Sequence, residues 1–471
     1  MYDIRFGTGG WRAIIGDDFI KENIQRVAQA ICNMAHREGK ADKPIVIGHD
    51  RRFLSDSAAE WVAEVFCAND IPVQYISRST PTPLVMYIVK DEGLHYGIEI
   101  TASHNPAAYN GIKLIVEEGR DAHVECTNAL EEEIRSLSEV KAMRFADARA
   151  AGKIEMLKNP FNPFIDSILS RLDVPAIRER GARILFDPMH GSGTYPLTVI
   201  LNTTRCTLDL IHNEKDAYFG GALPAPTKNT LHDLSYAVVN GGYDLGIAFD
   251  GDGDRLGIID NKGNYIDANQ ILVMFYYYLH EYRGWRGPVV RNLATTHMLD
   301  RVAESFGEVC HEVPVGFKYI SSKIDETDAI LGGESSGGLT VRGHIHGKDS
   351  IYAASLFVEM ISATGKDPAE FWRELVQRYG EYHMVEDNLT FLPEDKAAIN
   401  HVLMEEKKLP QFSKKVARVS YMDGCKVYFE DDSFLICRFS GTEPLLRIFA
   451  ESRSDAEAAT LIAEMKSFLA L

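Results

Sequence analysis

The chain has 471 residues, of which 45% are apolar and 25% are charged, a composition typical of a soluble globular protein that is too long for one hydrophobic core. Its net charge of −18 argues against nonspecific nucleic-acid binding and requires a local basic pocket for any anionic ligand. The longest apolar run, residues 271–279, is much shorter than a membrane span. Seven cysteines without a C-x-x-C pair, and an N-terminus without an apolar signal segment, favour a cytoplasmic protein with reduced thiols.

The N-terminal segment alternates predicted strands with predicted helices. Buried strands are expected at residues 45–47, 73–76 and 96–100, and a helix is expected at residues 24–35. The pattern Ser57-x-x-Glu60 is a capping box and predicts that a second helix begins there. This alternation of strand and helix is typical of a parallel sheet.

Residues 6–12 are rich in glycine, but they do not form a dinucleotide-binding fingerprint. Arg12 stands where the third glycine of that fingerprint belongs, and no strand of useful length precedes the segment. Two interpretations stay open. The segment is either a loop that offers N–H groups and one guanidinium to an anion, or a plain glycine-rich turn.

The strand at residues 96–100 leads into the sequence Thr-Ala-Ser-His-Asn-Pro at residues 101–106. Ser103, His104 and Asn105 bring a hydroxyl, an imidazole and an amide together in one loop. By itself this pattern is more often a turn that satisfies its own backbone than a catalytic loop. The chemistry therefore depends on what the other loops contain.

Another predicted strand, at residues 245–249, is followed by Asp250, Asp252 and Asp254 with glycines between them. Three such close carboxylates repel one another unless a cation lies between them. A calcium loop of the EF-hand type is excluded, because Arg255 occupies its glycine position and Asn261 its glutamate position. The pattern indicates a magnesium site for phosphoryl chemistry, with an acidic surface turn as the alternative.

Two further loops lie in the next segment. Residues 332–338 place Glu334 and two serines between glycines, which fits either a clamp for vicinal sugar hydroxyls or a hairpin turn. Residues 343–349 contain a His-x-His pair, and without a third clustered ligand these histidines are expected to be solvated.

The C-terminal segment is shorter and rich in predicted hairpins, at residues 416–421, 426–430 and 434–439. The loop at 438–444 and the following Arg447 supply two arginines, two hydroxyls and a glycine backbone, which suit a phosphate dianion. A surface ion-pair cluster with Glu443 is the alternative. The pattern Ser454-x-x-Glu457 is a capping box that predicts the start of a last helix.

Taken together, the four loops resemble those of the α-D-phosphohexomutase family, and they follow the family's order from residue 6 to residue 451. The resemblance implies that Ser103 is a phosphoserine and that Asp250, Asp252 and Asp254 bind one Mg²⁺ per chain together with Ser103. Departures from the family pattern are modest: Gly9 replaces an aspartate, and Ser350 replaces a glycine that is common after Asp349.

The resemblance also assigns the remaining site residues. It implies catalytic roles for Ser103, His104, Lys113 and Arg255, and substrate binding by Arg12, Lys318, Glu334, Ser336, Lys348, Arg438, Ser440, Gly441, Thr442 and Arg447.

The implied reaction is a two-step phosphoryl relay between a hexose 1-phosphate and a hexose 6-phosphate. Phospho-Ser103 would form a hexose 1,6-bisphosphate, which is both intermediate and activator, and would then recover a phosphoryl group from it. Lys113 and His104 are both candidates for proton transfer. A fourth domain that hinges near residues 380–381 would let the intermediate turn over without escaping.

The expected fold is α/β with four domains: three similar domains with mixed or parallel sheets and a smaller C-terminal α+β domain, with the active site in the central cleft. The expected domains are residues 1–155 with the phosphoserine loop, 156–268 with the metal loop, 269–380 with the sugar loop, and 381–471 with the phosphate loop.

The sugar loop Gly-Glu-Ser-Ser-Gly-Gly resembles the glucose type, so a phosphoglucomutase is expected first, and a phosphomannomutase or phosphoglucosamine mutase second. The expected partners are small hexose phosphates, with no nucleic acid and no membrane, and the expected state is a monomer or homodimer. A non-catalytic phosphosugar-binding protein and a phosphatase are the rival functions, although a mere binder would need neither Ser103 nor three aspartates.

Overall fold

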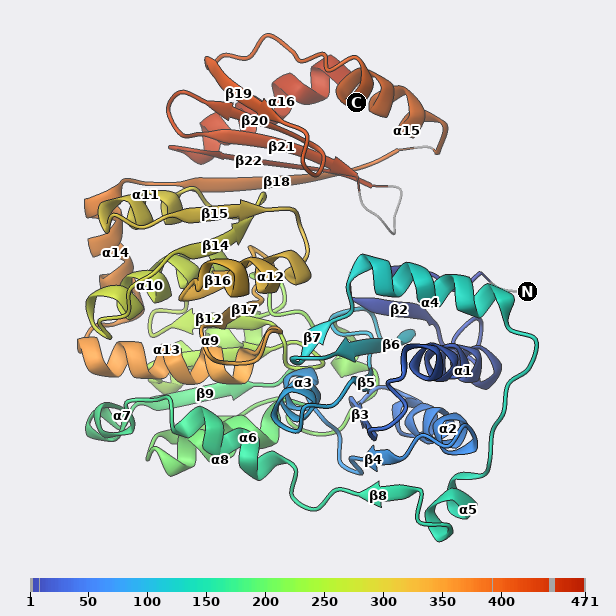
Figure 1. The fold of residues 1–471 in the computed structure, drawn as a ribbon. Helices are drawn as coiled ribbons and strands as arrows, with labels where there is room; N and C mark the ends of the chain where they lie inside the picture. The colour runs from blue at the N-terminus through green and yellow to red at the C-terminus, as the bar shows by residue number, and fades with distance from the viewer. Residues whose placement is uncertain (1–2, 8, 392, 440–444, 470–471) are drawn as a thin grey trace. The chain divides into compact units, whose positions relative to one another are not determined.

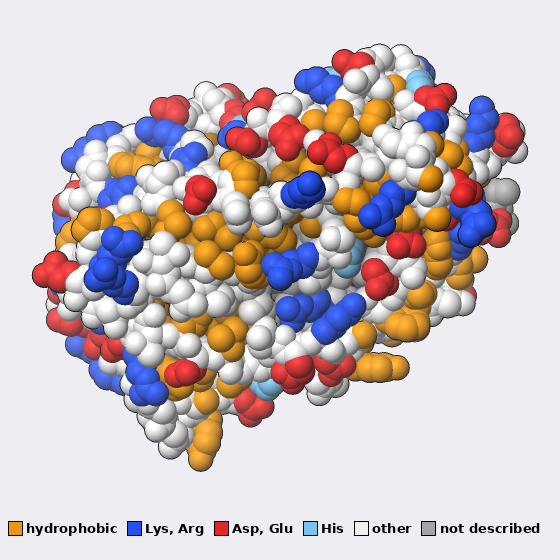
Figure 2. Space-filling model, turned by 90° about the horizontal axis from the view of Figure 1, so that it is seen from below, with side chains coloured by type: hydrophobic (Ala, Val, Ile, Leu, Met, Phe, Trp, Pro, Cys, Tyr) orange, Lys and Arg blue, Asp and Glu red, His pale blue; other side chains and the backbone are white. Residues whose placement is uncertain are grey.

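The computed structural model describes residues 3–7, 9–391, 393–439 and 445–469. The chain forms two compact units, Met1–Ala268 with Ser336–Pro368, and Asn269–Ser335 with Ala369–Leu471. Across the described ranges, no helix combines the length and the apolar character that a membrane crossing requires. Figure 2 shows acidic and basic side chains interspersed with apolar atoms on the face seen there, so the net charge of −18 does not form a single acidic field on that face.

The first unit begins with an eight-stranded sheet in the order β1-β2-β6-β5-β3-β4-β8, and β7 pairs with β6. Strands β3, β4 and β5 are parallel neighbours, as predicted, and β8, which was not predicted, pairs parallel with β4. Strand β6 runs antiparallel to both β2 and β5. The strands are β1 (Phe6–Gly7), β2 (Gly10–Ile14), β3 (Ile45–His49), β4 (Val73–Tyr75), β5 (Tyr96–Ile100), β6 (Tyr109–Val116), β7 (Arg120–Asp121) and β8 (Ile154–Met156).

Residues 6–7 and 10–14 of the glycine-rich N-terminal segment form two short strands, which neither interpretation of residues 6–12 predicted. Strand β1 pairs antiparallel with β2, and β2 pairs with β6. Trp11 and Ala13 point into the core while Arg12 between them is half-buried. This period-two alternation fixes the side of the sheet to which Arg12 belongs.

Five helices cover the first sheet, and α1 packs beside α2 (Figure 1). They are α1 (Lys21–Glu38), α2 (Ser55–Ala68), α3 (Thr82–Asp91), α4 (Val124–Ser136) and α5 (Phe145–Ala150). The predicted capping box at Ser57 is wrong, because α2 begins two residues earlier. Leu54 is left-handed with φ 64°, and the Ser55 hydroxyl donates to Oδ1 of Asp50 at 2.6 Å, which anchors the helix start.

The second sheet of this unit has the order β10-β9-β11-β12-β13, with β10, β9 and β11 parallel and β12 antiparallel to β11. Helix α13 packs on α7 and α8. The strands are β9 (Arg183–Asp187), β10 (Thr207–Leu210), β11 (Leu245–Phe249), β12 (Leu256–Asp260) and β13 (Tyr265–Ile266), and β17 (Leu339–Val341) belongs to the same unit. The helices are α6 (Phe161–Leu169), α7 (Val174–Arg180), α8 (Thr194–Thr203), η1 (Phe219–Gly221), α9 (His232–Gly241) and α13 (Ser350–Thr364).

The second unit contains a parallel sheet in which β14 (Val289–Asn292) pairs with β15 (Cys310–Val313) and β16 (Leu331–Gly333). Its core holds Val290, Phe317 and Ile320. The associated helices are α10 (Ala268–Glu281), α11 (Met298–Ser305), α12 (Phe317–Thr327) and α14 (Pro368–Tyr379). The apolar run at residues 271–279 lies in α10 and is largely buried, as its composition predicts.

The C-terminal part is a five-stranded antiparallel sheet in the order β18-β22-β21-β20-β19. Helix α16 packs against it through β18 and β22 (Figure 1). The elements are β18 (His383–Thr390), α15 (Pro393–Asn400), η2 (His401–Glu405), β19 (Val416–Ser420), β20 (Cys425–Phe429), β21 (Phe434–Phe439), β22 (Leu445–Ser452) and α16 (Asp455–Leu469). The predicted start of the last helix is confirmed, because α16 begins directly after Ser454, whose hydroxyl accepts the Glu457 N–H at 3.3 Å. The predicted domain boundaries and the central cleft stay predictions.

Candidate active site

The serine loop is held at the end of β5, a strand buried along its whole length. Thr101 N donates to Gly111 O at 3.0 Å, which ties the loop to β6. Ser103 N donates to Oγ1 of Thr101 at 2.8 Å, and Ser103 adopts a left-handed φ of 52°. The Ser103 residue is only 1% exposed. The sequence therefore folds this loop into a fixed turn with the serine inside the protein.

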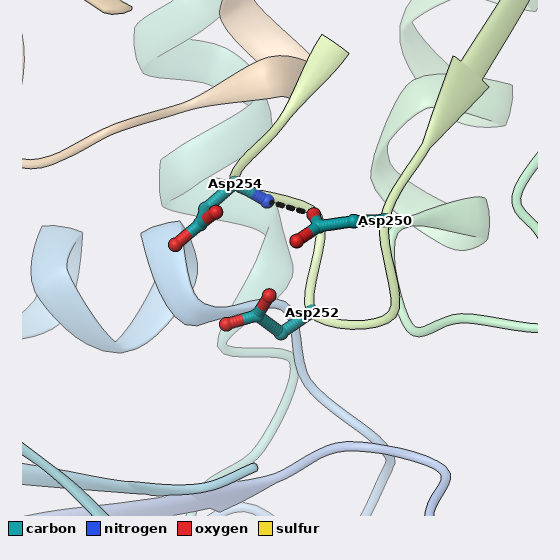
Figure 3. A group of neighbouring side chains, drawn as sticks. All are labelled: Asp250, Asp252 and Asp254. Carbon is teal, nitrogen blue, oxygen red and sulfur yellow. Dashed lines mark hydrogen bonds between the residues drawn. The ribbon is translucent and has the colours of Figure 1, made fainter. Parts of the chain in front are cut away.

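The aspartate loop connects β11 to β12. Asp250, Asp252 and Asp254 are buried, and one carboxylate oxygen from each lies within 4.8 Å of the others. Figure 3 shows the three side chains gathered around one space, with the Asp254 N–H donating to Oδ1 of Asp250 at 3.0 Å. Oδ1 of Asp252 and Oδ1 of Asp254 are buried, and neither has a hydrogen-bond partner in the described part of the chain. Clustered carboxylates with free oxygens are the ligand set of a hard divalent cation, so these residues fit magnesium.

Two lysines supply positive charge to the aspartates. Nζ of Lys113, on β6, lies 2.5 Å from Oδ2 of Asp252 and 2.7 Å from Oδ2 of Asp254, and Nζ of Lys348 lies 3.0 Å from the same Asp254 oxygen. Burial opposes ionisation of Asp254, but Lys113, Lys348 and Arg255 outweigh it and hold its pKa below the ordinary range. The same pairing raises the pKa of Lys113 against the effect of burial.

Asp250 differs from its two neighbours, because the ion pairs of Lys113 and Lys348 are made with Asp252 and Asp254. Burial, followed by repulsion from Asp252 and Asp254, raises the pKa of Asp250 to about 8. Its Oδ2 accepts the Ser103 hydroxyl at 2.8 Å, although the two residues are 147 positions apart in the chain. The structure thus joins the predicted serine to the predicted metal ligands.

Basic groups surround the serine on its other side. Nδ1 of His104 lies 3.3 Å from Oγ of Ser103. Burial, with added repulsion from Arg255, Arg12 and Lys348, lowers the pKa of His104, which favours the neutral imidazole. Nη1 of Arg12 donates to Oδ1 of Asn105 at 2.5 Å. Among the described residues Nε of Arg255 is buried without a hydrogen-bond partner. These cations form the local basic region that an anionic ligand needs.

Four of the predicted residues that the structure describes lie in the second unit. Oε1 of Glu334, at the end of β16, accepts hydrogen bonds from Nδ2 of Asn292 and from Gly316 N, both at 3.1 Å. The half-buried Lys318 is the second residue of α12. Arg438 on β21 is directly opposite Arg447 on β22.

Arg438 is also tied to the Gly316 loop. Oδ2 of Asp423 accepts Nε of Arg438 at 2.9 Å and the Val315 N–H at 3.0 Å. The exposed Ser336 lies in the first unit. Ser440, Gly441 and Thr442 are outside the described residues.

The sequence reasoning missed two groups that contact the site. Thr82, at the start of α3, donates its hydroxyl to Oδ2 of Asp252 at 2.6 Å. Arg52 is fully buried and donates to Ser103 O at 2.5 Å. Both residues come after buried strands of the first sheet, and this position in the sequence is the feature that could have identified them. No local pattern in the sequence distinguishes them from ordinary capping residues.

The chain matches profiles for all four domains of the phosphoglucomutase/phosphomannomutase family. Residues 3–141 match α/β/α domain I, 162–263 domain II, 267–379 domain III and 394–467 the C-terminal domain. These matches confirm the predicted fold class of three α/β domains followed by a distinct C-terminal domain.

Similar proteins extend over almost the whole chain. A phosphoglucomutase/phosphomannomutase of Thermococcus kodakarensis is 27% identical, covering 96% of this chain and 95% of that protein. A phosphoglucosamine/phosphogalactosamine mutase of Sulfurisphaera tokodaii is 26% identical, covering 98% of each. The crystal structure of a putative phosphomannomutase from Thermus thermophilus superposes with a TM-score of 0.85 at 26% identity, covering 100% of both chains. This chain therefore belongs to the α-D-phosphohexomutase family.

Proposed function

We propose that this protein interconverts hexose 1-phosphate and hexose 6-phosphate, that Ser103 carries the phosphoryl group, and that glucose is the preferred sugar. The observation that carries the proposal is the 2.8 Å hydrogen bond between Oγ of Ser103 and Oδ2 of Asp250 within a cluster of three buried aspartates. A nucleophile, a metal-type ligand set and basic groups in one place specify phosphoryl transfer.

The proposed reaction has two transfers that balance each other. In the first, the bond between phosphorus and Oγ of Ser103 breaks, a bond from phosphorus to the free sugar hydroxyl forms, and the hydroxyl proton leaves. In the second, Oγ attacks the other phosphate of the hexose 1,6-bisphosphate, and the sugar oxygen that is released takes up a proton. Lys113 and His104 are the candidates for these proton transfers, because both lie at the aspartate and serine loops.

Mg²⁺, which Asp250, Asp252 and Asp254 would hold, supplies electrostatic stabilisation of the transferring phosphoryl group. The protein's own cations add to this effect. Arg12, Arg255 and Lys348 belong to the same unit as Ser103 and lower the pKa of His104 through their charge. We assign Arg12 and Lys348 to substrate phosphate or sugar oxygens, and Arg255 to the transferring group.

The second unit supplies most of the proposed sugar and phosphate contacts. Glu334 accepts hydrogen bonds from Asn292 and Gly316, and we assign its carboxylate to sugar hydroxyls, together with Lys318 and with Ser336 of the first unit. Arg438 and Arg447 form a pair of guanidinium groups on neighbouring strands, which suits a phosphate dianion. With Ser440, Gly441 and Thr442 they form the proposed anchor for the phosphate that is not reacting.

The preference for glucose rests on the sequence of the sugar loop. The similar proteins are named for glucose, mannose and glucosamine phosphates, so they support a hexose phosphate without selecting one sugar. A coupled assay of glucose 1-phosphate, mannose 1-phosphate and glucosamine 1-phosphate, with glucose 1,6-bisphosphate as activator, tests this preference. We expect the highest kcat/KM with glucose 1-phosphate. A higher value with either other sugar would reassign the substrate.

The same assay separates the mutase from its rivals. The Ser103→Ala variant should lose mutase activity while still binding glucose 1-phosphate, because only the phosphoryl carrier is removed. Release of inorganic phosphate at a rate equal to sugar turnover would indicate a phosphatase. Binding without turnover by the phosphorylated wild type would indicate a non-catalytic phosphosugar-binding protein.

A further inference from the structure

We infer that the buried ion pair of Arg52 and Asp50 is a positioning device that fixes the Ser103 turn from both sides. This inference rests on the proposed function, since it assigns the pair to the serine that carries the phosphoryl group. Arg52 and Asp50 lie directly after β3, on the loop that precedes α2. Neither residue belongs to the catalytic or substrate-binding groups described above.

The Arg52 guanidinium binds four carbonyl oxygens of a single loop. Nη2 donates to Ser103 O at 2.5 Å and to Asn105 O at 2.8 Å, and Nη1 donates to Pro106 O at 3.0 Å and to Tyr109 O at 3.1 Å. The Arg52 side chain is 0% exposed. Only arginine presents several donors in one rigid plane, so the loop is held at the carbonyl groups on the C-terminal side of Ser103.

Asp50 acts on the other side of the serine. Its Oδ2 lies 3.1 Å from Nε of Arg52 and accepts the Thr101 hydroxyl at 2.7 Å. Oγ1 of Thr101 in turn accepts the Ser103 N–H at 2.8 Å. The carbonyl of Ser103 is therefore held by Arg52 directly, and its N–H is held by Asp50 through Thr101.

This double contact accounts for the backbone of the serine. The φ of Ser103 is 52°, a left-handed conformation that serine rarely adopts unless its surroundings impose it. That conformation accompanies the hydrogen bond from the Ser103 hydroxyl to Asp250. Relaxation of the turn would move Oγ away from the aspartates, and misplacement of a nucleophile slows the chemical step more than it weakens binding.

The aspartate loop packs closely on the carbonyl group that Arg52 holds. A Cβ added to Gly251 would lie 2.7 Å from Ser103 O and 3.7 Å from Nη2 of Arg52, so the backbone of the aspartate loop packs directly on the clamped carbonyl. The Arg52 guanidinium also lies over the Phe219 ring, at 4.7 Å from its centroid. Arg52 therefore lies close to the serine loop, to Phe219 and to Gly251 of the aspartate loop.

The test compares Thr101→Val with Thr101→Ser, and adds Arg52→Lys. Valine matches threonine in shape but breaks the connection from Asp50 to Ser103, whereas serine retains the hydroxyl. We expect kcat of Thr101→Val to fall by about 10- to 100-fold, while KM changes by less than about threefold. Thr101→Ser should retain most of kcat. Arg52→Lys keeps the charge but loses the planar donor set, so its kcat should fall in the same way.

Thr204→Val is the matched control, because Thr204 is buried and its hydroxyl binds Ile200 O at the end of α8. It should lose stability without a change in kcat. A second readout is the rate at which glucose 1,6-bisphosphate phosphorylates Ser103, followed by intact mass well below the melting temperature. This rate should fall in Thr101→Val and Arg52→Lys but not in Thr204→Val.

The outcomes separate this inference from the proposed function. An inactive wild type that acquires no phosphate would overturn the proposed function. An active wild type whose kcat and phosphorylation rate are unchanged in Thr101→Val and Arg52→Lys would overturn the positioning role alone. A loss in Thr101→Ser as large as that in Thr101→Val would also overturn it, because the hydroxyl would then not be the group that matters.

Discussion

Nζ of Lys113 lies 2.5 Å from Oδ2 of Asp252, and both side chains are buried. Lys113 lies on β6 of the first sheet, and Asp252 lies in the loop between β11 and β12 of the second sheet, so the contact joins the first two α/β parts of the chain. The lysine compensates charge that would otherwise repel within the aspartate cluster. A divalent cation bound there would provide the same compensation.

The first prediction follows from this contact. Lys113→Met leaves buried carboxylates without their counter-charge, so in EDTA we expect the free energy of unfolding to fall by about 3–5 kcal/mol. Addition of Mg²⁺ should recover part of this loss, because the cation replaces the ammonium. Urea unfolding with EDTA and with Mg²⁺ measures both values. An equal loss under the two conditions would contradict the interpretation.

The control is Lys415→Met, which removes a lysine from an exposed pair. Nζ of Lys415 lies 2.6 Å from Oε1 of Glu430, and the two side chains are 77% and 54% exposed. An exposed pair contributes only about 0–1 kcal/mol, so this variant should change little, with or without Mg²⁺.

The second prediction concerns the metal itself. Mg²⁺ at about 100 times its dissociation constant should stabilise the wild type by about 2.7 kcal/mol, since only the folded protein has the site. In Asp254→Asn the rise in melting temperature on adding Mg²⁺ should largely disappear, while the exposed Asp56→Asn should behave as the wild type. Differential scanning calorimetry gives the shifts. A full shift in Asp254→Asn would place the metal elsewhere.

The third prediction tests the proposed phosphate anchor. Arg438 and Arg447 are cross-strand neighbours, so each guanidinium can bind the same dianion. Arg447→Gln should raise KM for glucose 1-phosphate by about 10-fold or more, as expected for loss of a charged hydrogen bond, with a smaller change in kcat. The exposed Lys415→Gln is the control for loss of one positive charge. An unchanged KM in Arg447→Gln would remove that residue from the anchor.

The fourth prediction is a pH dependence of stability in the second unit. Burial opposes ionisation of Glu312, but Arg291 at 2.6 Å and Lys426 at 2.7 Å outweigh it and lower its pKa to about 2. Burial and repulsion from Arg291 lower the pKa of Lys426 to about 7, so we regard Arg291 as the main counter-charge of Glu312.

A lowered carboxyl pKa stabilises the fold above the unfolded-state value and loses that effect as pH falls. Glu312 should therefore contribute about 3 kcal/mol above pH ~4.5, and this contribution should vanish as the pH falls to about 2. In Glu312→Gln, the free energy of unfolding should depend less steeply on pH between about 4.5 and 2. The exposed Glu304→Gln is the matched control. If Glu312→Gln keeps the pH dependence of the wild type, another group must cause the loss of stability in acid.

The serine and aspartate loops were predictable because each follows a buried strand. Each loop also displays reactive or charged side chains close together in the sequence. The start of α2 was not predictable, because the residue before the helix is Leu54, which has no capping side chain, and Ser55 is the first helical residue, bound to Asp50. The β1–β2 pair was missed for a similar reason, because its strands are short and glycine-rich and depend on β6 for pairing.

Arg52 shows the limit of sequence reasoning most clearly. Its four acceptors are backbone carbonyls, and carbonyls carry no sequence signal. The three aspartates, by contrast, display their chemistry in their side chains. Side-chain ligand sets could thus be found from sequence, whereas the groups that position them could not.

The central claim is that Ser103 carries the phosphoryl group, and its most direct test is a single-turnover measurement on purified protein. After incubation with glucose 1,6-bisphosphate, mass mapping should place one phosphate on Ser103, and excess glucose 1-phosphate should then remove it in one turnover with formation of the bisphosphate. The Ser103→Ala variant should acquire no phosphate. A phosphate on another residue, or a phospho-Ser103 that glucose, mannose and glucosamine phosphates all leave intact, would contradict the account.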